Sequence, residues 1–411
     1  MTRDISGQSR PTAFWGWRGR FSPSSHDILK SAGIVVASIA VGLVGWSGNP
    51  SLLPVAMLFP ALWAFAPTRL IAALVSAAYF LAASRGLPQG VANFYGSGFG
   101  AGIALWLAAA IGFVLVHVAL WTGRPGWGRT LRYCIAALLM SVPPFGIVGW
   151  AHPITATGIV FPGWGWWGLA AAAIGLLAMT TRAWPIATFV LGGLCLWSTA
   201  MWTPPDMPKG WVGVDTNFRG EGGQYADFAQ QRETINKVRA AASDGAKIVV
   251  LPESAAGIWT PTVERLWLRE LAGLNATINV GAIVVDNAGY DNVMIEIAGE
   301  GARILYRERM PVPVSMWQPW LGWFGEPAGA RAHFFANPIV ESGDLRVAPL
   351  ICYEQLIIWP MLQSAFHTPD VIVATGNGWW TDNTSIVAIQ KAGATAWARL
   401  FGLPIIFAFN I

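Results

Sequence analysis

The distribution of acidic residues divides this chain into two unlike halves. Between Asp27 and Asp206 there is no Asp or Glu, and up to Pro204 the chain carries 11 Lys and Arg against 2 acidic residues. Beyond Pro204 it carries 15 Lys and Arg against 20 acidic residues. The chain as a whole is 54% hydrophobic and 12% charged, about half the charge of an average soluble domain. The first half is therefore expected to be a membrane domain. The net charge of +4 is an average over both halves and predicts no direct nucleic-acid binding.

Seven apolar runs in the first half are long enough, or nearly so, to cross a bilayer of about 30 Å. They cover residues 29–46, 52–66, 70–83, 103–121, 133–150, 166–179 and 184–201, the third and sixth being short. Basic residues gather on alternate connections, in the amino-terminal tail, at Arg69, from Arg124 to Arg132 and at Arg182, whereas only Arg85 lies on the other side. The positive-inside rule then predicts a multi-pass protein of the inner (plasma) membrane. Its parts are a cytoplasmic tail (1–28), a membrane domain of about seven helices (29–203) and a domain on the periplasmic side (204–411).

Strands and helices are predicted to alternate in the second half. A strand at 211–214 precedes a helix over 225–242, on which Phe228, Ile235 and Val238 recur at helical spacing. Thr260 and Pro261 are typical of a helix start. Further strands are expected at 247–251, 278–285, 292–297, 303–306, 345–352, 370–375 and 404–409, with helices from residue 354 and over 385–401. This order is typical of a layered α/β domain of about 200 residues.

Two apolar strands of this domain end in residues that can carry chemistry. The strand at 247–251 leads to Glu253, and the strand from Leu345 ends at Cys352, the only cysteine of the second half. A thiol that attacks a carbonyl needs a base and donors for the oxyanion, so Glu253 is a candidate base and the N–H of Tyr353 a candidate donor. The alternative is that Cys352 is a buried hydrophobic residue. The three cysteines form no disulfide framework, and no metal or cofactor motif is visible.

Four motifs occur in an order that resembles the nitrilase (carbon–nitrogen hydrolase) superfamily. They are Pro252-Glu-Ser254, Tyr290-Asp-Asn292, Ala348-Pro-Leu-Ile-Cys-Tyr-Glu354 and Gly376-Asn-Gly-Trp-Trp380. With the apolar first half, they look most like the membrane-bound apolipoprotein N-acyltransferase branch and, within it, the TraB proteins of plasmid conjugal transfer. The resemblance implies an αββα sandwich with a Glu, Lys, Cys triad. The candidate substrate-binding residues of this domain are Tyr353, Glu354, Asn377, Trp379 and Trp317.

The chain departs from this pattern at the expected lysine. Tyr306 and Pro313 keep the spacing of the acyltransferases, but Glu308 stands where they have the lysine. An anion there repels both thiolate and oxyanion, so the chemistry needs a substitute cation. Arg307 and Arg309 flank the position. They are interpreted as a solvated strand end or, through a shifted hairpin register that leaves Glu308 pointing outward, as a replacement for the lysine.

Two further features bear on the site and the fold. The acyltransferases have a Phe-Gly-Glu sequence after the hairpin, where this chain has Val314-Ser-Met316. In one interpretation, Glu326 of the later Phe324-Gly-Glu326 supplies the missing carboxylate. The loop from Pro311 to Ala330, with Trp317, Trp320 and Trp323, is expected either to dip into the bilayer interface as a lid or to pack against the membrane half. The acyltransferases continue past the strand at 404–409, so a carboxy-terminally shortened sandwich is expected.

These observations leave two hypotheses for function. The first is a membrane-anchored enzyme that forms an acyl-Cys352 intermediate on a membrane lipid or envelope protein, with conjugation-machinery components as partners. The second is a catalytically degenerate scaffold or assembly factor for that machinery. The loss of the lysine favours the scaffold, whereas the joint presence of Glu253 and Cys352 favours the enzyme. A transporter is disfavoured because the predicted spans hold no acidic residue.

Overall fold

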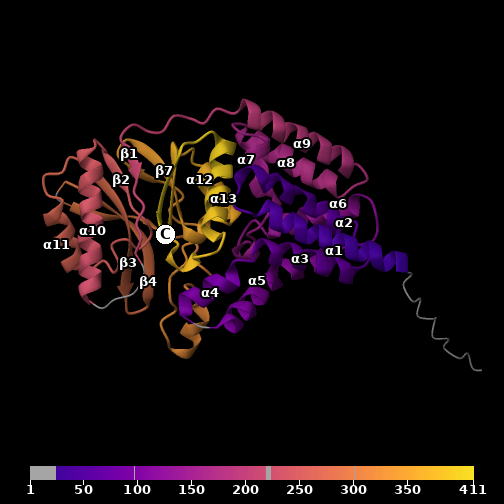
Figure 1. Ribbon diagram of the computed structural model, residues 1–411, viewed down its shortest axis with the longest axis horizontal. Coiled ribbons are helices and arrows are strands. Elements are labelled where there is room, and N and C mark those ends of the chain that lie inside the picture. The colour runs from indigo at the N-terminus through magenta and orange to yellow at the C-terminus, as the bar shows by residue number, and fades with distance from the viewer. Residues whose placement is uncertain (1–24, 97, 219–223, 300) are drawn as a thin grey trace, which may run out of the picture.

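The computed structural model describes residues 25–96, 98–218, 224–299 and 301–411. Most of the expected cytoplasmic tail lies outside these residues. A helical part and an α/β part lie side by side, joined by the extended segment that follows helix α9 (Figure 1).

The helical part contains long helices separated by short or irregular ones. The long ones are α1 (Ser25–Gly45), α5 (Phe99–Leu120) and α9 (Trp184–Met201), which are long and apolar enough to cross a membrane. The pair α3 (Arg69–Ala83) and α4 (Leu87–Tyr95), bent by 51°, is a fourth candidate. The others are η1 (Pro50–Leu58), α2 (Phe59–Ala64), α6 (Trp127–Leu139), η2 (Phe145–Val148), η3 (Pro153–Ala156), α7 (Thr157–Val160) and α8 (Gly165–Met179).

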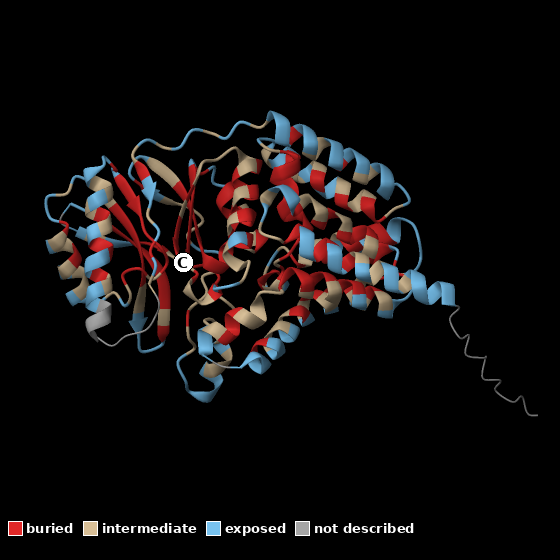
Figure 2. Ribbon diagram, viewed as in Figure 1, coloured by how far each residue is buried: buried red, intermediate tan, exposed pale blue. Residues whose placement is uncertain are grey.

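Within the described residues, fewer of the seven apolar runs form single long helices than the sequence predicts. The run at 133–150 is not one helix, because α6 ends at Leu139 and Pro143 and Pro144 cannot continue it. The run at 52–66 is divided between η1, which holds Pro54, and α2. Exposed residues cover the outer faces of α1 and α9 (Figure 2), and many are large apolar side chains such as Phe189 and Leu196.

Two sheets build the α/β part. The first has the order β1 (Trp211–Gly213), β2 (Ile248–Val250), β3 (Thr277–Asp286), β4 (Gly289–Ala298) and β5 (Gly301–Arg307). The second has the order β6 (Val340–Ser342), β7 (Leu345–Ile351), β8 (Val371–Asn377) and β9 (Ile405–Asn410). Strands β1 to β3 are parallel, as are β7 to β9, whereas β4, β5 and β6 run antiparallel to the strands they pair with. The parallel strands β2 and β7 are buried almost throughout, as expected for strands covered on both faces.

The packing is that of an αββα sandwich. Helices α10 (Gln224–Ser243) and α11 (Pro261–Glu270) cover the first sheet, and one hydrophobic cluster joins them to it (Figure 1). A second cluster, with Val250, Met294, Ile351 and Val373, lies between the sheets. Ile235 and Val238 of α10 are buried as predicted, but Phe228 is exposed, so the apolar face of α10 was placed incorrectly at its start.

The outer helices of the second sheet are shared with the helical part. Helices α12 (Ile358–Ala365) and α13 (Ile386–Phe401) pack on the second sheet, and their far sides join the large core of the helical part. The contact between α7 and α13 is tight: a Cβ on Gly158 would collide with the Ala396 carbonyl. The helix expected from residue 354 is preceded by the turn η5 (Cys352–Gln355), and α12 begins at Ile358.

Candidate active site

The sandwich brings the two predicted strand-end residues together. Glu253 follows β2 in the first sheet, and Cys352 follows β7 in the second. The carboxyl ends of parallel strands carry the functional groups of many α/β domains. Cys352 has a φ of 45° and Ser254 a φ of 57°. A left-handed backbone costs these non-glycine residues about 1–3 kcal/mol, which is typical of functional sites.

Glu253 is buried and surrounded by donors. Its Oε1 accepts a hydrogen bond from Asn292 Nδ2 at 2.8 Å, and its Oε2 accepts one from the Asn377 N–H at 3.0 Å. The Cys352 thiol donates a third. Burial outweighs these donors and raises the pKa of Glu253 to about 7. Burial, followed by the charges of Glu253 and Glu308, raises the pKa of Cys352 well above its usual range. The resting pair is therefore a neutral thiol beside a carboxyl group that can accept its proton.

Glu308 points into the site, contrary to the alternative in which it points outward. It is fully buried, and its Oε2 accepts a hydrogen bond from Asn292 Nδ2 at 2.9 Å. The register of the β4–β5 pair does shift, at Met294 and Ile295, but the shift leaves Glu308 inside. Burial, followed by the charge of Glu253, raises the pKa of Glu308 well above its usual range.

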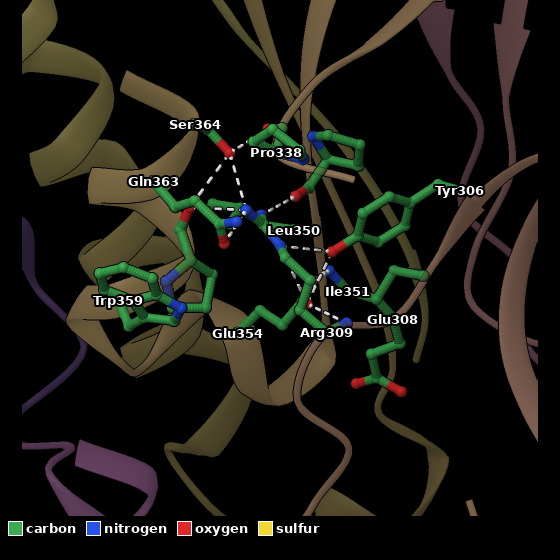
Figure 3. Close-up of polar contacts among 12 residues, drawn as sticks. Tyr306, Glu308, Arg309, Pro338, Leu350, Ile351, Glu354, Trp359, Gln363 and Ser364 are labelled. Atoms are coloured by element: carbon green, nitrogen blue, oxygen red, sulfur yellow. Dashed lines mark hydrogen bonds and ion pairs between the residues drawn. The ribbon is translucent and has the colours of Figure 1, made fainter. Parts of the chain in front are cut away.

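Arg309 is fully buried, so its interpretation as a solvated strand end was wrong. Its guanidinium donates to the Tyr306 hydroxyl at 2.9 Å and to the carbonyl oxygens of Pro360 and Pro349 at 2.9 and 3.1 Å. It also lies 3.6 Å from the carboxylate of Glu354. In Figure 3 the Glu308 carboxyl points away from this network. Arg309 therefore stabilises the second sheet and α12, and it does not take the place of a cation at Cys352.

Arg307 does not enter this network. It is partly exposed and forms an ion pair with Asp291. Asp291 also accepts hydrogen bonds from Arg331 and His333, both at 2.9 Å. Among the described residues, no lysine or arginine forms a hydrogen bond or ion pair with Glu253, Glu308 or Cys352. The expected replacement of the lysine by a flanking arginine is therefore not seen.

The two residues after Cys352 have structural contacts. Glu354 is fully buried and accepts hydrogen bonds from the Tyr306 hydroxyl and the Arg309 N–H, both at 2.7 Å, and from the Ile351 N–H at 2.8 Å. Tyr353 donates its hydroxyl to the Ile147 carbonyl of the helical part at 2.7 Å. Glu354 thus fixes the turn that carries the thiol, and Tyr353 anchors that turn to the helical part.

Sequence reasoning missed two polar residues at the site. Gln390 of α13 places its Nε2 3.7 Å from the Cys352 sulfur. No pattern in the sequence distinguishes it from the other residues of its helix. Asn292 belongs to one of the recognised motifs, but its position between two carboxyl groups depends on the pairing of β3, β4 and β5 and could not be read from spacing.

A cavity of about 400 Å³ opens from Cys352 and Glu253 toward the helical part. Its walls are mostly apolar and come from α3, α4, α5 and the segment around Trp150, together with residues 312–316 and helix α13. Asn377, Tyr353 and Trp379 line it, and Trp379 stacks on Phe94 of α4 with ring centroids 5.7 Å apart. A volume of this size is typical of small-molecule sites.

The loop from Pro311 to Ala330 contributes to this cavity at its start only. Trp317 packs edge-on against Phe334, with ring centroids 5.7 Å apart, and does not line the cavity. Trp323 and Phe324 are 83% and 77% exposed. Glu326 is also exposed, so the idea that it supplies a carboxylate to the site was wrong. Among the described residues, no group of three His, Cys, Asp or Glu side chains could hold a metal ion.

The whole chain is similar to proteins that are named for conjugal transfer. It is 57% identical over its full length to the full length of the "Conjugal transfer protein TraB" of Agrobacterium fabrum. It is 56% identical, over 94% of its length and 99% of the relative, to a "Probable conjugal transfer protein TraB" of Sinorhizobium fredii. The chain belongs to the TraB family of conjugal transfer proteins.

Within this TraB-family chain, residues 268–399 match the carbon-nitrogen hydrolase family, in agreement with the two-sheet architecture described above. A carbon-nitrogen hydrolase from Helicobacter pylori G27 aligns with 49% of this chain and 73% of its own, at 13% identity and a TM-score of 0.36. An amidase from Nesterenkonia sp. aligns with 49% of this chain and 74% of its own, at 12% identity and a TM-score of 0.36.

Proposed function

We propose that this protein is a membrane-anchored acyltransferase or amidase of conjugal transfer, which takes an acyl group onto Cys352 and passes it to an amine or to water. The acyl donor is a lipid or a lipid-modified envelope protein. The observation that carries the proposal is the apolar cavity, because it joins the buried thiol and its base to helices that also present apolar faces outward.

The geometry supports a simple sequence of steps. Glu253 takes the proton of the Cys352 thiol as the sulfur bonds to the carbonyl carbon of the donor, and the carbonyl electron pair moves onto oxygen. When the tetrahedral intermediate collapses, the bond to the leaving group breaks and Glu253 returns the proton to that group. Deacylation repeats these steps with an amine or water as the nucleophile. The apolar cavity walls hold the acyl chain and exclude water from the thioester.

The proposed location is the inner membrane, with several membrane-spanning helices and the α/β part on the periplasmic side. Arg69, the first residue of α3, donates to the Trp121 carbonyl, and Arg129 of α6 donates to the Ala64 carbonyl, so these basic helix starts lie together. In Figure 1 the starts of α1 and α3 and the α8–α9 connection lie at the end remote from the sheets. Basic connections on one side and the sandwich on the other agree with a periplasmic domain.

The test is acylation of the detergent-solubilised full chain, followed by intact mass. Activated esters with short and long acyl chains serve as donors, and plasmid transfer is measured in parallel. The expected result is an adduct that forms faster with the long chain and is absent from Cys352→Ala. Cys134→Ala and Cys195→Ala are the matched controls, because both thiols are free and only partly buried. They are expected to acylate as the unmodified protein does.

A second variant tests the cavity itself. Ala109→Trp on α5 places a large ring in the cavity, whereas Ala104→Trp on the same helix lies at an exposed position outside it. The first substitution is expected to slow acylation by the long-chain ester about tenfold or more and to spare the short-chain ester. Equal behaviour of the two variants, or no chain-length preference in the unmodified protein, would contradict the proposed site.

The scaffold hypothesis is favoured by one specific observation, the buried carboxyl of Glu308 where a cation was expected. It predicts that no ester acylates Cys352 and that Cys352→Ala and Glu253→Gln both support normal plasmid transfer. Such a pair of results would replace the enzyme with a nitrilase-like domain used for assembly of the transfer apparatus.

A further inference from the structure

One side-chain amide bridges two buried carboxyl groups. The Nδ2 atom of Asn292 donates one hydrogen to Glu253 Oε1 at 2.8 Å and the other to Glu308 Oε2 at 2.9 Å. No cation among the described residues neutralises either group. Two anions held this close without a counter-charge are costly, so the pair is expected to retain a proton.

The contacts of each carboxyl indicate where that proton resides. Glu253 accepts three hydrogen bonds, from Asn292, from the Asn377 N–H and from the Cys352 thiol, and each favours its charged form. Glu308 accepts one hydrogen bond, from Asn292. Its Oε1 is fully buried and has no partner, which is unfavourable for a charged oxygen. The proton therefore belongs on Glu308.

We propose that Glu308 acts as a neutral carboxylic acid whose O–H donates a hydrogen bond to the oxyanion formed when Cys352 attacks the acyl donor. This inference rests on the proposed function and deepens it. A protonated carboxyl provides a donor without a positive charge, so the same position can lack a cation and still stabilise the intermediate. Asn292 then keeps the acid and the base in fixed positions on the two sides of one amide.

The electrostatic surroundings of Glu308 agree with a neutral group. The titratable and charged groups that bear on it from the neighbouring elements are Glu253, Cys352, Tyr290 and the pair of Glu354 and Arg309. Burial raises the pKa of Glu308 most, and the charges of Glu253 and Glu354 raise it further. Burial also raises the pKa of Tyr290 to about 12, so this phenol brings no charge at neutral pH.

The acylation step needs no proton from outside the site. The thiol proton moves to Glu253, the sulfur–carbon bond forms, and the carbonyl π electrons move onto oxygen, where the Glu308 O–H donates a hydrogen bond and keeps its proton. On collapse the electron pair re-forms the carbonyl, the leaving group departs, and Glu253 supplies its proton. Glu308 ends the step as it began.

The test compares Glu308→Gln, which keeps an uncharged donor of nearly the same shape, with Glu308→Leu, which keeps the size and loses the donor. The rate of Cys352 acylation by a long-chain activated ester is measured against pH for the full chain in detergent. Loss of one oxyanion donor typically costs about 10²–10³-fold, so this is the expected loss for Glu308→Leu, whereas Glu308→Gln is expected to stay within about tenfold.

The pH profile of Glu308→Gln decides between a neutral and a charged Glu308. If Glu308 is neutral, the substitution removes no charge beside Glu253. The pH at which the acylation rate falls to half, which reports the pKa of Glu253, then stays unchanged. A midpoint lowered by about one unit or more would overturn the proposal, because it would show that an anion had been removed. Equal rates for the Gln and Leu variants would overturn it as well.

A spectroscopic measurement separates this inference from the proposed function. Infrared spectra at about pH 8, where most of Glu253 is ionised because its pKa is about 7, are expected to show the carbonyl stretch of a buried protonated carboxyl, which is lost in Glu308→Gln and kept in Cys352→Ala. If the band is present but no donor acylates Cys352, the proposed function fails while the proton assignment stands. If the band is absent from the unmodified protein, the inference about Glu308 fails on its own.

Discussion

Gly281 lies where a single methyl group would displace the proposed base. It is in the middle of β3, and a Cβ built there would approach the Pro252 carbonyl oxygen to 2.3 Å, Glu253 Cα to 2.6 Å and Ser254 N to 2.7 Å. All three are backbone atoms, so no rotation of a side chain relieves the overlap. Gly281→Ala is therefore expected to push the segment that carries Glu253 away from the sheet.

The size of the shift follows from these distances. Moving Glu253 Cα from 2.6 Å to the 3.4 Å where ordinary contact begins requires about 0.8 Å. A displacement of about 1 Å at a reacting group costs on the order of 10²-fold in rate, equivalent to about 2.7 kcal/mol. The overpacking also destabilises the fold by about 1–3 kcal/mol. The expected result is a folded variant that acylates Cys352 about a hundred times more slowly.

The assay is the rate of adduct formation on Cys352 from a long-chain activated ester, measured by intact mass, with a thermal melt to establish that the variant is folded. Gly301→Ala is the matched control, because a Cβ at this position of the same sheet meets no atom within 4 Å. Its rate is expected to stay within twofold of the unmodified protein. A folded Gly281→Ala that acylates at the normal rate would refute the assignment of Glu253 as the base.

Three further predictions follow from the charges in the site. Because Glu253 must be ionised to accept the thiol proton and its pKa is raised to about 7, acylation is expected to be half-maximal near pH 7 and to fall about tenfold per unit below it, as a pH series of initial rates can check. Arg309→Met leaves the fully buried Glu354 without its cation, so chemical unfolding is expected to show a loss of about 3–5 kcal/mol, whereas Arg307→Met, at a partly exposed pair, is expected to lose about 1 kcal/mol or less. Finally, the pKa of Glu308 is raised, so the folded state holds its proton above the ordinary glutamate pKa of about 4.3, and stability is lost as pH rises. Melting curves of Glu308→Gln are therefore expected to lose less stability than those of the unmodified protein between about pH 5 and 9, and parallel curves would contradict this.

The sequence predicted the strand ends well and the hairpin poorly. Glu253 and Cys352 follow short apolar strands that are buried on both faces, and such runs can be recognised without tertiary information. The segment from Arg307 to Arg309 is different, because a bulge in the β4–β5 pair decides which side chains turn inward. Alternation along a strand predicts one set of inward residues, and one extra residue reverses it.

The prediction of the helical part from sequence was limited by a different cause. Apolar composition locates segments that avoid water, but it does not distinguish a helix exposed to lipid from one packed against protein. The run at 133–150 is apolar because most of it lies against other helices and beside the sandwich, near the Ile147 carbonyl that holds Tyr353. The role of Gln390 could not be predicted for a similar reason, since its contact with the Cys352 sulfur exists only after α13 packs on the second sheet.

The layer formed by α12 and α13 fixes the position of Cys352 relative to the helical part. These helices belong to the hydrophobic core of both parts, and the residue beside the thiol is tied to the helical part by the Tyr353 hydroxyl. The α/β part is therefore packed firmly against the helical part and is not joined to it by the linker alone. The Cys352 sulfur is thus held at one fixed position relative to the apolar helices. Under the proposed function, it reaches only those carbonyl groups of a membrane donor that lie at the same depth in the bilayer.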